Sequence, residues 1–445
     1  MVSLPVGEVP EAVARIARPL YGEDDLDRML DLIGKSRYVL IGEATHGSHE
    51  FYDLRASLTR KLIADRGFSA VAVEGDWPDA LRVDRYVRGG GDDESAIDAL
   101  GGFLRFPMWM WRNGDVASFV EWLRGHNSRR AAEHRAGFYG IDLYSLHSSM
   151  AAVLSYLEEV DPEAAAEARQ RYSCFDHAPD PQQYGMHAHF GTKQCEEEVI
   201  AQLVEMQRRR SARSGRTPTG DAWFHAMQNA HVVKDAEAYY RTMFAGRNAS
   251  WNLRDTHMAD TVDMLAQHLG REGAPAKIVV WAHNSHVGDA RATEMGESGQ
   301  LTLGQLLRMR HPDDTCLIGF TTDHGTVECA YDWDEPGKRE RVRAALPGSW
   351  EELFHGTGMP RFMLTSTALK RTIGEQAERL HRAIGVVYRP ETERRSHYYH
   401  ARLADQYDIV IHIDETHAVH PLDTPQRVTE PTAEAEPPET FPSGI

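Results

Sequence analysis

Residues 38–47 read YVLIGEATHG, an apolar run followed by a glycine and then by the polar residues Glu43 and His46. The run is continuous rather than alternating, which is typical of a parallel strand that is covered on both faces. Two later runs, at 384–388 and 408–413, are further candidates for the same sheet. Similar runs that we also predict to be strands lie at 69–74, 137–142, 277–282 and 315–320.

Helical patterns separate the first predicted strands. In 49–66 the residues Phe51, Leu54, Leu58 and Leu62 recur at helical spacing, and Pro78 begins a shorter helical pattern over 78–88. Strands that alternate with helices predict an α/β fold with a mostly parallel central sheet flanked by helices.

The chain between residues 145 and 270 is almost wholly helical in pattern. We therefore predict a large inserted helical lobe that forms a cleft with the core. The core then comprises residues 1–144 and 271–423, and the Pro-, Glu- and Thr-rich residues 424–445 are expected to be a disordered tail. The helices expected in the lobe span 147–159, 162–172, 194–213, 221–245 and 254–269, with a loop at 214–220.

Composition excludes several classes of partner. The 445 residues carry 49 Lys+Arg against 67 Asp+Glu, a formal charge of −18, which disfavours nucleic acid and anionic membrane surfaces. No apolar run approaches the roughly 20 residues that span a bilayer. Residues 1–11 lack the basic and apolar regions of a secretory signal, so we expect none.

The four cysteines lack CxxC spacing, so we expect reduced thiols and a cytoplasmic protein. They are Cys174, Cys195, Cys316 and Cys329.

Polar residues follow each of the predicted core strands. In open parallel sheets, ligands bind beyond the carboxyl ends of the strands, so these residues are expected to meet at one edge. A solvated loop or a helix cap would explain any one of them, but their recurrence after successive strands favours a functional site. The residues are Glu43 and His46, Glu74 and Asp76, Asp142, His283 and His286, and finally Asp323 and His324.

Arg55 shares the apolar face of the predicted helix 49–66. A guanidinium that points inward needs a carboxylate partner, and Glu43 and Glu74 are the nearest candidates. The alternative is that the long side chain reaches the surface along its own stem.

The segment 103–112, FLRFPMWMWR, is more aromatic than an ordinary loop. Either Trp109 and Trp111 form a wall of a ligand pocket, or they pack between the core and the lobe. Both interpretations stay open on the sequence.

Several catalytic motifs are absent. There is no GxSxG nucleophile elbow, no P-loop and no dinucleotide fingerprint. A metal site built from His46, His283, His286 and a carboxylate is chemically possible for zinc or iron. We expect His187 and His189 to lie on the surface of the lobe.

A histidine beside a carboxylate, without a Ser or Cys nucleophile, favours general-base activation of water. Further imidazoles and an arginine would then stabilise developing oxyanion charge. The reaction this combination favours is hydrolysis of an ester or a similar acyl compound without a covalent intermediate.

The motifs that carry this chemistry resemble those of the erythromycin esterase family, which also includes succinoglycan biosynthesis-type proteins. The resemblance covers roughly residues 20–420. It rests on IGEATHGSHEFYDLRASLTRKLIADRGFSAVAVEGDWPDA, FYGIDLYS, NLRDTHMAD, VVWAHNSHVGD and YRPETERRSHYYHARLADQYDIVIHID.

The resemblance implies a metal-independent hydrolase of macrolide-like esters that needs no cofactor. In it, His46 is the general base on water. The remaining catalytic positions that the resemblance implies are Glu43, Glu74, Arg55, His283 and His286. Residues expected to contact a small-molecule substrate are Asp76, Trp77, Trp109, Trp111, Asp142 and Asn284.

Two other functions use the same residues. One is a metal-dependent hydrolase with the His/Glu cluster as ligands. The other is a protein that binds haem or a small metabolite without turnover.

Overall fold

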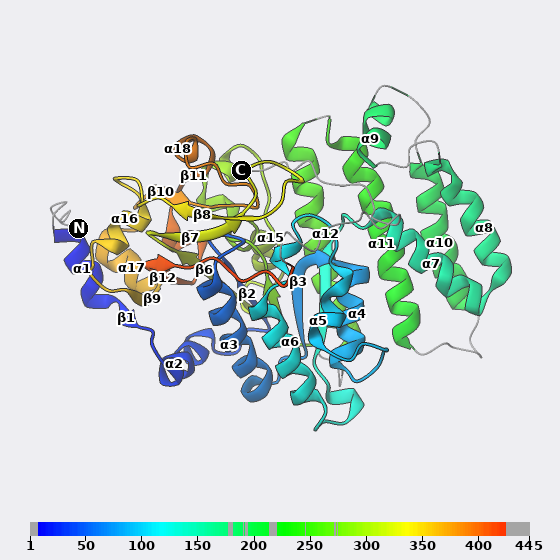
Figure 1. Cartoon of the computed structure of the whole chain (residues 1–445), viewed down its shortest axis with the longest axis horizontal. Helices are drawn as coiled ribbons and strands as arrows, with labels where there is room; N and C mark the ends of the chain where they lie inside the picture. The colour runs from blue at the N-terminus through cyan, green and yellow to red at the C-terminus, as the bar shows by residue number, and fades with distance from the viewer. Residues whose placement is uncertain are drawn as a thin grey trace.

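The computed structural model describes residues 8–176, 181–189, 191, 195–212, 220–244, 246–270, 273 and 275–423. Its centre is an eight-stranded sheet in the order β1-β9-β12-β6-β2-β5-β3-β4 (Figure 1). Six strands, from β12 to β4, are parallel, and β9 and β1 continue the sheet in antiparallel fashion. The strands are β1 Arg18–Pro19, β2 Tyr38–Ile41, β3 Ala70–Asp76, β4 Gly137–Asp142, β5 Ile278–Trp281, β6 Thr315–Thr321, β9 Arg361–Thr365 and β12 Ile409–Ile413. The predicted α/β class and its five core strands are confirmed.

Of the two later candidate strands, only one joins the sheet. Residues 408–413 supply β12, which pairs in parallel with β6. The run 384–388 is instead an irregular buried segment that makes isolated bridges, so that prediction is wrong. Its backbone crosses the strand ends: Ile384 donates to the Ala44 carbonyl at 2.9 Å and accepts from the His46 amide at 3.3 Å. The apolar character of this run therefore reflects burial rather than strand pairing.

Both faces of the sheet are buried, as the continuous apolar runs predict. In β2, Val39 and Ile41 face one core, and Tyr38 and Leu40 face the other. The first core packs against α2 Glu23–Ile33, α3 His49–Arg66, α4 Trp77–Val87, α5 Ala96–Ala99 and α6 Gly114–Asn127. The second packs against α1 Val9–Ile16, α12 Arg247–His268, α15 Leu303–Arg310, α16 Trp350–His355, α17 Ser366–Ile373 and α19 Leu403–Gln406.

Two small sheets and three short helices complete the core. One sheet pairs β10 Arg379–Arg382 with β11 Tyr398–Ala401. The other has the order β13-β7-β8, formed by Glu415–Thr416, His324–Cys329 and Lys338–Val342. The helices are α13 Asn284–Val287, α14 Glu294–Glu297 and α18 Glu393–Ser396.

The helical lobe lies at one end of the molecule, in green at the right of Figure 1. Its helices enclose an apolar core of their own, and α12 also buries Met258 and Val262 against the sheet. The lobe comprises α7 Leu146–Val160, α8 Pro162–Tyr172, α9 Pro181–His189, α10 Glu196–Ala212, α11 Gly220–Thr242 and α12. His187 and His189 are exposed, as expected, and belong to helix α9.

The cysteines differ from expectation. Cys174, just after α8, and Cys195, just before α10, form a disulfide. The two cysteines are 21 residues apart in sequence, a spacing without a motif, and the packing of the lobe helices brings their Cα atoms to 5.8 Å. Cys316 and Cys329 are free and buried.

Within the part of the chain that the structure describes, every helix is too short or too polar to cross a membrane. The predicted tail, 424–445, and nearly all of the predicted loop 214–220 lie outside the described residues.

Candidate active site

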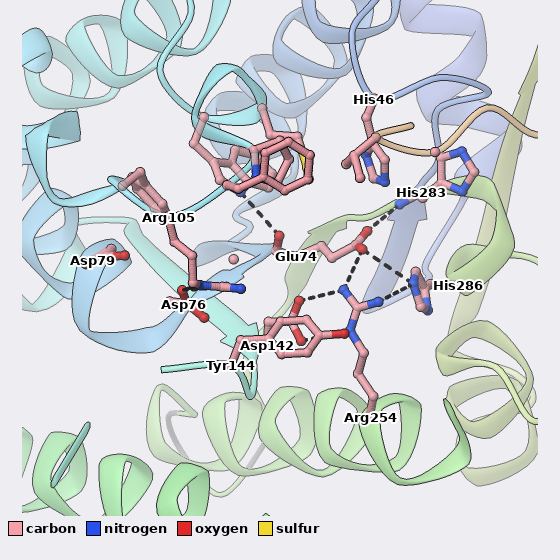
Figure 2. Close-up of a pocket in the computed structure, with 18 of the residues that line it drawn as sticks. His46, Glu74, Asp76, Asp79, Arg105, Asp142, Tyr144, Arg254, His283 and His286 are labelled. Atoms are coloured by element: carbon pink, nitrogen blue, oxygen red, sulfur yellow. Dashed lines mark hydrogen bonds and ion pairs between the residues drawn. The ribbon is translucent and has the colours of Figure 1, made fainter. Parts of the chain in front are cut away.

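A cavity lies where the carboxyl ends of β2, β3, β4 and β5 meet helix α12 (Figure 2). It measures about 960 Å³ when the part open to solvent is included, a size typical of small-molecule sites. The predicted residues that line it are His46, Glu74, Asp76, Trp111, Asp142, His283 and His286. The structure thus gathers at one edge residues that the strand ends predicted. Asp323 and His324, after β6, are not among the lining residues.

His46 is held by a carboxylate from its own loop. Its Nδ1 donates to Glu43 Oε1 at 2.8 Å, which leaves Nε2 as the nitrogen with a free lone pair. Arg55, fully buried on α3, places Nη2 2.9 Å from Glu43 Oε2. The predicted inward-pointing Arg55 is therefore paired with Glu43, and its guanidinium also stacks over the Tyr52 ring. The Tyr52 hydroxyl in turn donates to the His46 carbonyl at 2.7 Å.

His283 lies beside His46, with ring centroids 4.6 Å apart. Its amide donates to Glu74 Oε2 at 2.8 Å, and its Nδ1 accepts from the Ser285 amide at 3.3 Å. Burial holds the pKa of His283 well below its usual value, and the proximity of His46 adds to this effect. A neutral ring that accepts at Nδ1 carries its proton on Nε2, and this Nε2 has no partner among the described residues. His283 therefore offers a buried N–H donor next to His46.

His286 is held by a residue of the lobe. Its Nδ1 lies 2.9 Å from Asp255 Oδ2, and its ring stacks on Trp251 with centroids 4.6 Å apart. Burial favours the neutral ring, but Asp255 and Glu74 outweigh it and raise the pKa of His286 to about 9. At neutral pH this pKa favours the charged ring, with Nδ1–H directed at Asp255 and Nε2–H directed at Glu74 Oε1, 3.4 Å away.

Arg254 joins the carboxylates of two strands. It donates to Glu74 Oε1 at 2.8 Å and to Asp142 Oδ2 at 2.6 Å, and its Nη1 lies 3.1 Å from His286 Nε2. Burial alone would raise the pKa of Glu74, yet His286 and Arg254 hold it well below its usual value. The pKa of Asp142 is lowered against its burial by the same arginine. Both acids are therefore ionised.

Asp76 behaves differently from its neighbours. It pairs in register with Asp142 and accepts from Arg105 Nη2 at 2.6 Å. Burial raises the pKa of Asp76, and the charge of Asp142 raises it further against the effect of Arg105. Figure 2 shows Arg105 reaching Asp76 at the side of the cavity away from the histidines.

A model of the erythromycin esterases matches residues 63–416. The chain belongs to the erythromycin esterase family. Erythromycin esterase type II of Escherichia coli is 24% identical over 338 residues, which cover 69% of this chain and 74% of that protein. Membership supports an ester hydrolase of this type and confirms the predicted family.

Three solved structures share the fold. A Bacillus cereus protein has a TM-score of 0.78 at 17% identity and covers 94% of this chain and 99% of its own. A succinoglycan biosynthesis protein has a TM-score of 0.71 at 20% identity, covering 95% and 100%. A mutant of the erythromycin esterase EreC in its open conformation has a TM-score of 0.65 at 16% identity, covering 95% and 100%.

Some residues predicted for this esterase-family site lie outside the cavity lining. Trp77 is buried against Tyr139 and Phe224, beneath the lobe, because it begins α4 on the side facing α11. Asn284 is fully buried and exchanges hydrogen bonds with the Phe320 backbone, so it ties β5 to β6.

The two tryptophans of segment 103–112 differ: Trp111 forms part of the cavity wall, and Trp109 packs in the first core of the sheet. Trp111 lines the cavity and donates from Nε1 to the Glu74 carbonyl at 3.2 Å. Gly75 permits this approach, because a Cβ there would lie 2.9 Å from Trp111 Nε1. Trp109 is absent from the lining and packs edge-on against Phe106 instead.

Sequence reasoning did not single out Trp251, Arg254 and Asp255, although the motif NLRDTHMAD contains two of them. The available signal is helical: Trp251, Arg254, Asp255 and Met258 follow an i, i+3, i+4, i+7 spacing, so they share one face of α12. That face turns toward the strand ends. The sequence signal for this group is therefore an Arg–Asp pair on the same helix face as a Trp and a Met.

Each of the three cavity histidines is held through one ring nitrogen. Protein partners occupy Nδ1 of His46, His283 and His286. Among the described residues, three potential ligand atoms come within 4.8 Å of one another in a single group, and that group lies elsewhere.

Proposed function

We propose that this protein hydrolyses an ester, a macrolactone or a related natural-product ester, with water activated by His46 and without a metal or a covalent intermediate. The observation that carries the proposal is the Glu43–His46 pair at the cavity, with Nδ1 bound at 2.8 Å and Nε2 left to accept a proton. We further propose that it acts in the cytoplasm, on a substrate of the macrolide kind.

In this mechanism, water bound at His46 Nε2 attacks the ester carbonyl as the imidazole takes its proton. Glu43 stabilises the imidazolium that forms, and Arg55, with Nη2 2.9 Å from Glu43 Oε2, holds Glu43 in place. The carbonyl becomes a tetrahedral oxyanion, and no protein atom bonds to the substrate.

Two groups are suited to the oxyanion. His283 presents a buried N–H that has no partner among the described residues, and the charged His286 and Arg254 contact Glu74, as the His283 amide does. Preorganised donors of this kind typically contribute about 10²–10³-fold each to the rate. Collapse of the intermediate breaks the acyl C–O bond, and the proton on His46 passes to the departing alkoxide. A lactone thereby becomes a hydroxy acid that is heavier by one water.

The remaining cavity residues support binding of a mostly apolar ring with polar substituents. Its walls carry the aromatic residues Phe103, Phe106, Trp111, Tyr144, Trp251 and Trp333. Asp76 with Arg105 and the nearby Asp79 place polar groups at the far end from the histidines (Figure 2).

The test is incubation of the protein with an erythromycin-type macrolactone and a panel of simpler esters, in parallel with and without EDTA. We expect a product heavier by one water from the wild type, and no product above background from His46→Asn. His49→Asn is the matched control, because this histidine also pairs with a carboxylate, Asp115, but lies half-exposed outside the cavity lining.

Three results would contradict the proposal. One is the absence of product across the panel, and another is full activity in His46→Asn. The third is activity that EDTA abolishes and zinc restores, which would favour the metal-dependent hydrolase.

A further inference from the structure

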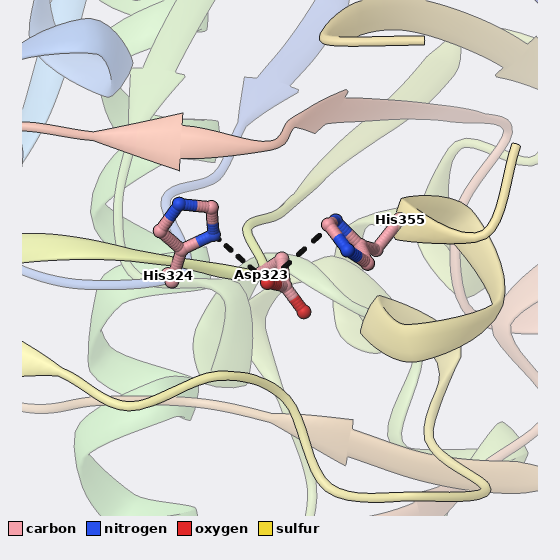
Figure 3. A group of neighbouring side chains, drawn as sticks. All are labelled: Asp323, His324 and His355. Atoms are coloured by element: carbon pink, nitrogen blue, oxygen red, sulfur yellow. Dashed lines mark hydrogen bonds and ion pairs between the residues drawn. The ribbon is translucent and has the colours of Figure 1, made fainter. Parts of the chain in front are cut away.

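A second cluster of histidines and carboxylates lies outside the cavity, where the predicted strand-end pattern continues after β6. Asp323 and His324 follow that strand, and His355 ends helix α16. Figure 3 shows the three side chains converging. One potential ligand atom from each lies within 4.8 Å of the others.

We propose that Asp323, His324 and His355 form a binding site for a divalent cation of the zinc class. Two imidazole nitrogens and one carboxylate oxygen are a ligand set that suits zinc and its neighbours among the transition metals. None of the three lines the catalytic cavity, so this site is separate from the proposed ester chemistry.

The spacing of the ligand atoms fits a tetrahedral ion. Metal–ligand bonds of about 2.0–2.1 Å place neighbouring ligand atoms about 3.3 Å apart. Asp323 Oδ2 lies 2.8 Å from His324 Nδ1 and 3.7 Å from His355 Nδ1, so both separations bracket that value. His324 Nδ1 donates to this carboxylate oxygen, whereas His355 Nδ1 donates to Asp414 Oδ1 at 2.7 Å, so an ion would take the place of both protons.

The carboxylate is buried and fixed in place. The Asp323 side chain is only 6% exposed, its amide donates to the Asp414 carbonyl at 3.1 Å, and its Oδ1 accepts from the Ala345 amide at 3.2 Å. The Asp323 carbonyl accepts from Arg382 Nη2 at 2.6 Å. Asp323 is therefore positioned by three segments before any ion arrives, which lowers the cost of ordering a site.

Charge at the site also favours a cation. Asp414 Oδ1 lies 2.7 Å from His355 Nδ1 and adds a second negative group next to the ion. In the described part of the chain, the ion pairs of Asp323 and Asp414 are with histidines alone, and the nearby Arg382 is ion-paired with Glu393. The two histidine side chains are 38% and 51% exposed, so an ion can enter from solvent.

A bound ion would tie together parts of the chain that are distant in sequence. It would join the end of α16 to the turn between β6 and β7 and to Asp414 after β12. Because an ion that binds only the folded state shifts the unfolding equilibrium, it should raise the melting temperature.

The experiment is isothermal titration of tag-free, EDTA-treated full-length protein with ZnCl₂, repeated with Co²⁺ to record its visible absorption bands. We expect about one Zn²⁺ per chain, a Co²⁺ spectrum typical of tetrahedral nitrogen and oxygen ligands, and a higher melting temperature with Zn²⁺. In His355→Ala the Kd should rise at least about tenfold, because even the loss of an outer partner of a ligand costs that much.

Two further variants make the result specific. His417→Ala is the matched control, since His417 is an exposed histidine bonded to a carboxylate, Glu50, at 2.7 Å outside the proposed site. It should bind Zn²⁺ as the wild type does. His46→Asn should also retain the ion. The proposal is overturned if the wild type binds no Zn²⁺ near stoichiometry, if His355→Ala binds as tightly as wild type, or if the ion is lost in His46→Asn instead.

Discussion

The cavity contains two histidine–carboxylate pairs that are built in different ways. His46 and Glu43 come from one loop, three residues apart, at the end of β2. His286 follows β5 and receives its carboxylate, Asp255, from helix α12. One pair is thus local to the core, and the other exists only because α12 packs over the sheet.

The two pairs also differ in charge. Glu43 divides its oxygens between His46 and the buried Arg55, so a cation already balances it. His286 faces two carboxylates, Asp255 and Glu74, which raise its pKa to about 9 against burial. This difference indicates separate tasks: the core pair accepts a proton from water, and the pair completed by α12 supplies a fixed positive charge.

The largest expected effect comes from removing the base. His46→Asn should lower kcat by about 10³-fold or more, because no group then accepts the proton from water or donates it to the leaving group. Steady-state kinetics on the best ester of the panel measures it, with circular dichroism to verify the fold. A loss of kcat below tenfold would mean that another residue transfers the proton, and the two pairs would then not have the separate tasks described here.

Glu43→Gln tests the carboxylate of the core pair and should cost about 10²–10⁴-fold in kcat. The amide no longer stabilises the imidazolium, and it leaves Arg55 as a buried charge without its partner, so the melting temperature should fall as well. Kinetics and thermal denaturation report the two effects separately. Wild-type kcat with a lowered melting temperature would make Glu43 purely structural.

Asp255→Asn tests the second pair and should cost about tenfold near neutral pH. The charged form of His286 is present below its pKa and is lost as pH rises through about 9. Without Asp255 the pKa falls, so the alkaline loss of kcat/KM should begin at lower pH than in the wild type. An unchanged alkaline limb in this variant would refute the role given to His286.

The smallest effect is expected at Trp77, which packs beneath the lobe and not at the cavity. Trp77→Phe should change kcat/KM less than about twofold while lowering the melting temperature, because only core packing is lost. Trp111→Phe is the matched comparison and should raise KM, since Trp111 lines the cavity and holds the Glu74 carbonyl. Equal kinetics for the two variants would mean that the lining tryptophan does not contact substrate.

Sequence predicted the fold, and the gathering of several residues of the candidate site, for a physical reason. Parallel strands buried on both faces leave continuous apolar runs, and the residues directly after them must meet at one edge, so His46, Glu74 and His283 were found together. Arg55 was found because its position on an apolar helix face demands a partner, and Glu43 supplies it.

The rest of the candidate site depends on packing between segments that are distant in sequence, which a local sequence pattern does not encode. Arg254 and Asp255 reach the site only through the docking of α12 on the sheet. The Cys174–Cys195 disulfide follows from the packing of lobe helices, and the run 384–388 is apolar through burial without being a strand. Asp323 and His324 followed the strand-end rule but face a different neighbour, His355.

The most direct measurement of the contrast between the two pairs is nitrogen-15 NMR of histidine-labelled protein at pH 7.5, with His46→Asn and His286→Asn used to assign the signals. We predict that the His286 ring carries protons on both nitrogens, while the Nδ1 proton of His46 lies in the hydrogen bond to Glu43. A His286 ring with a single proton at this pH would contradict it.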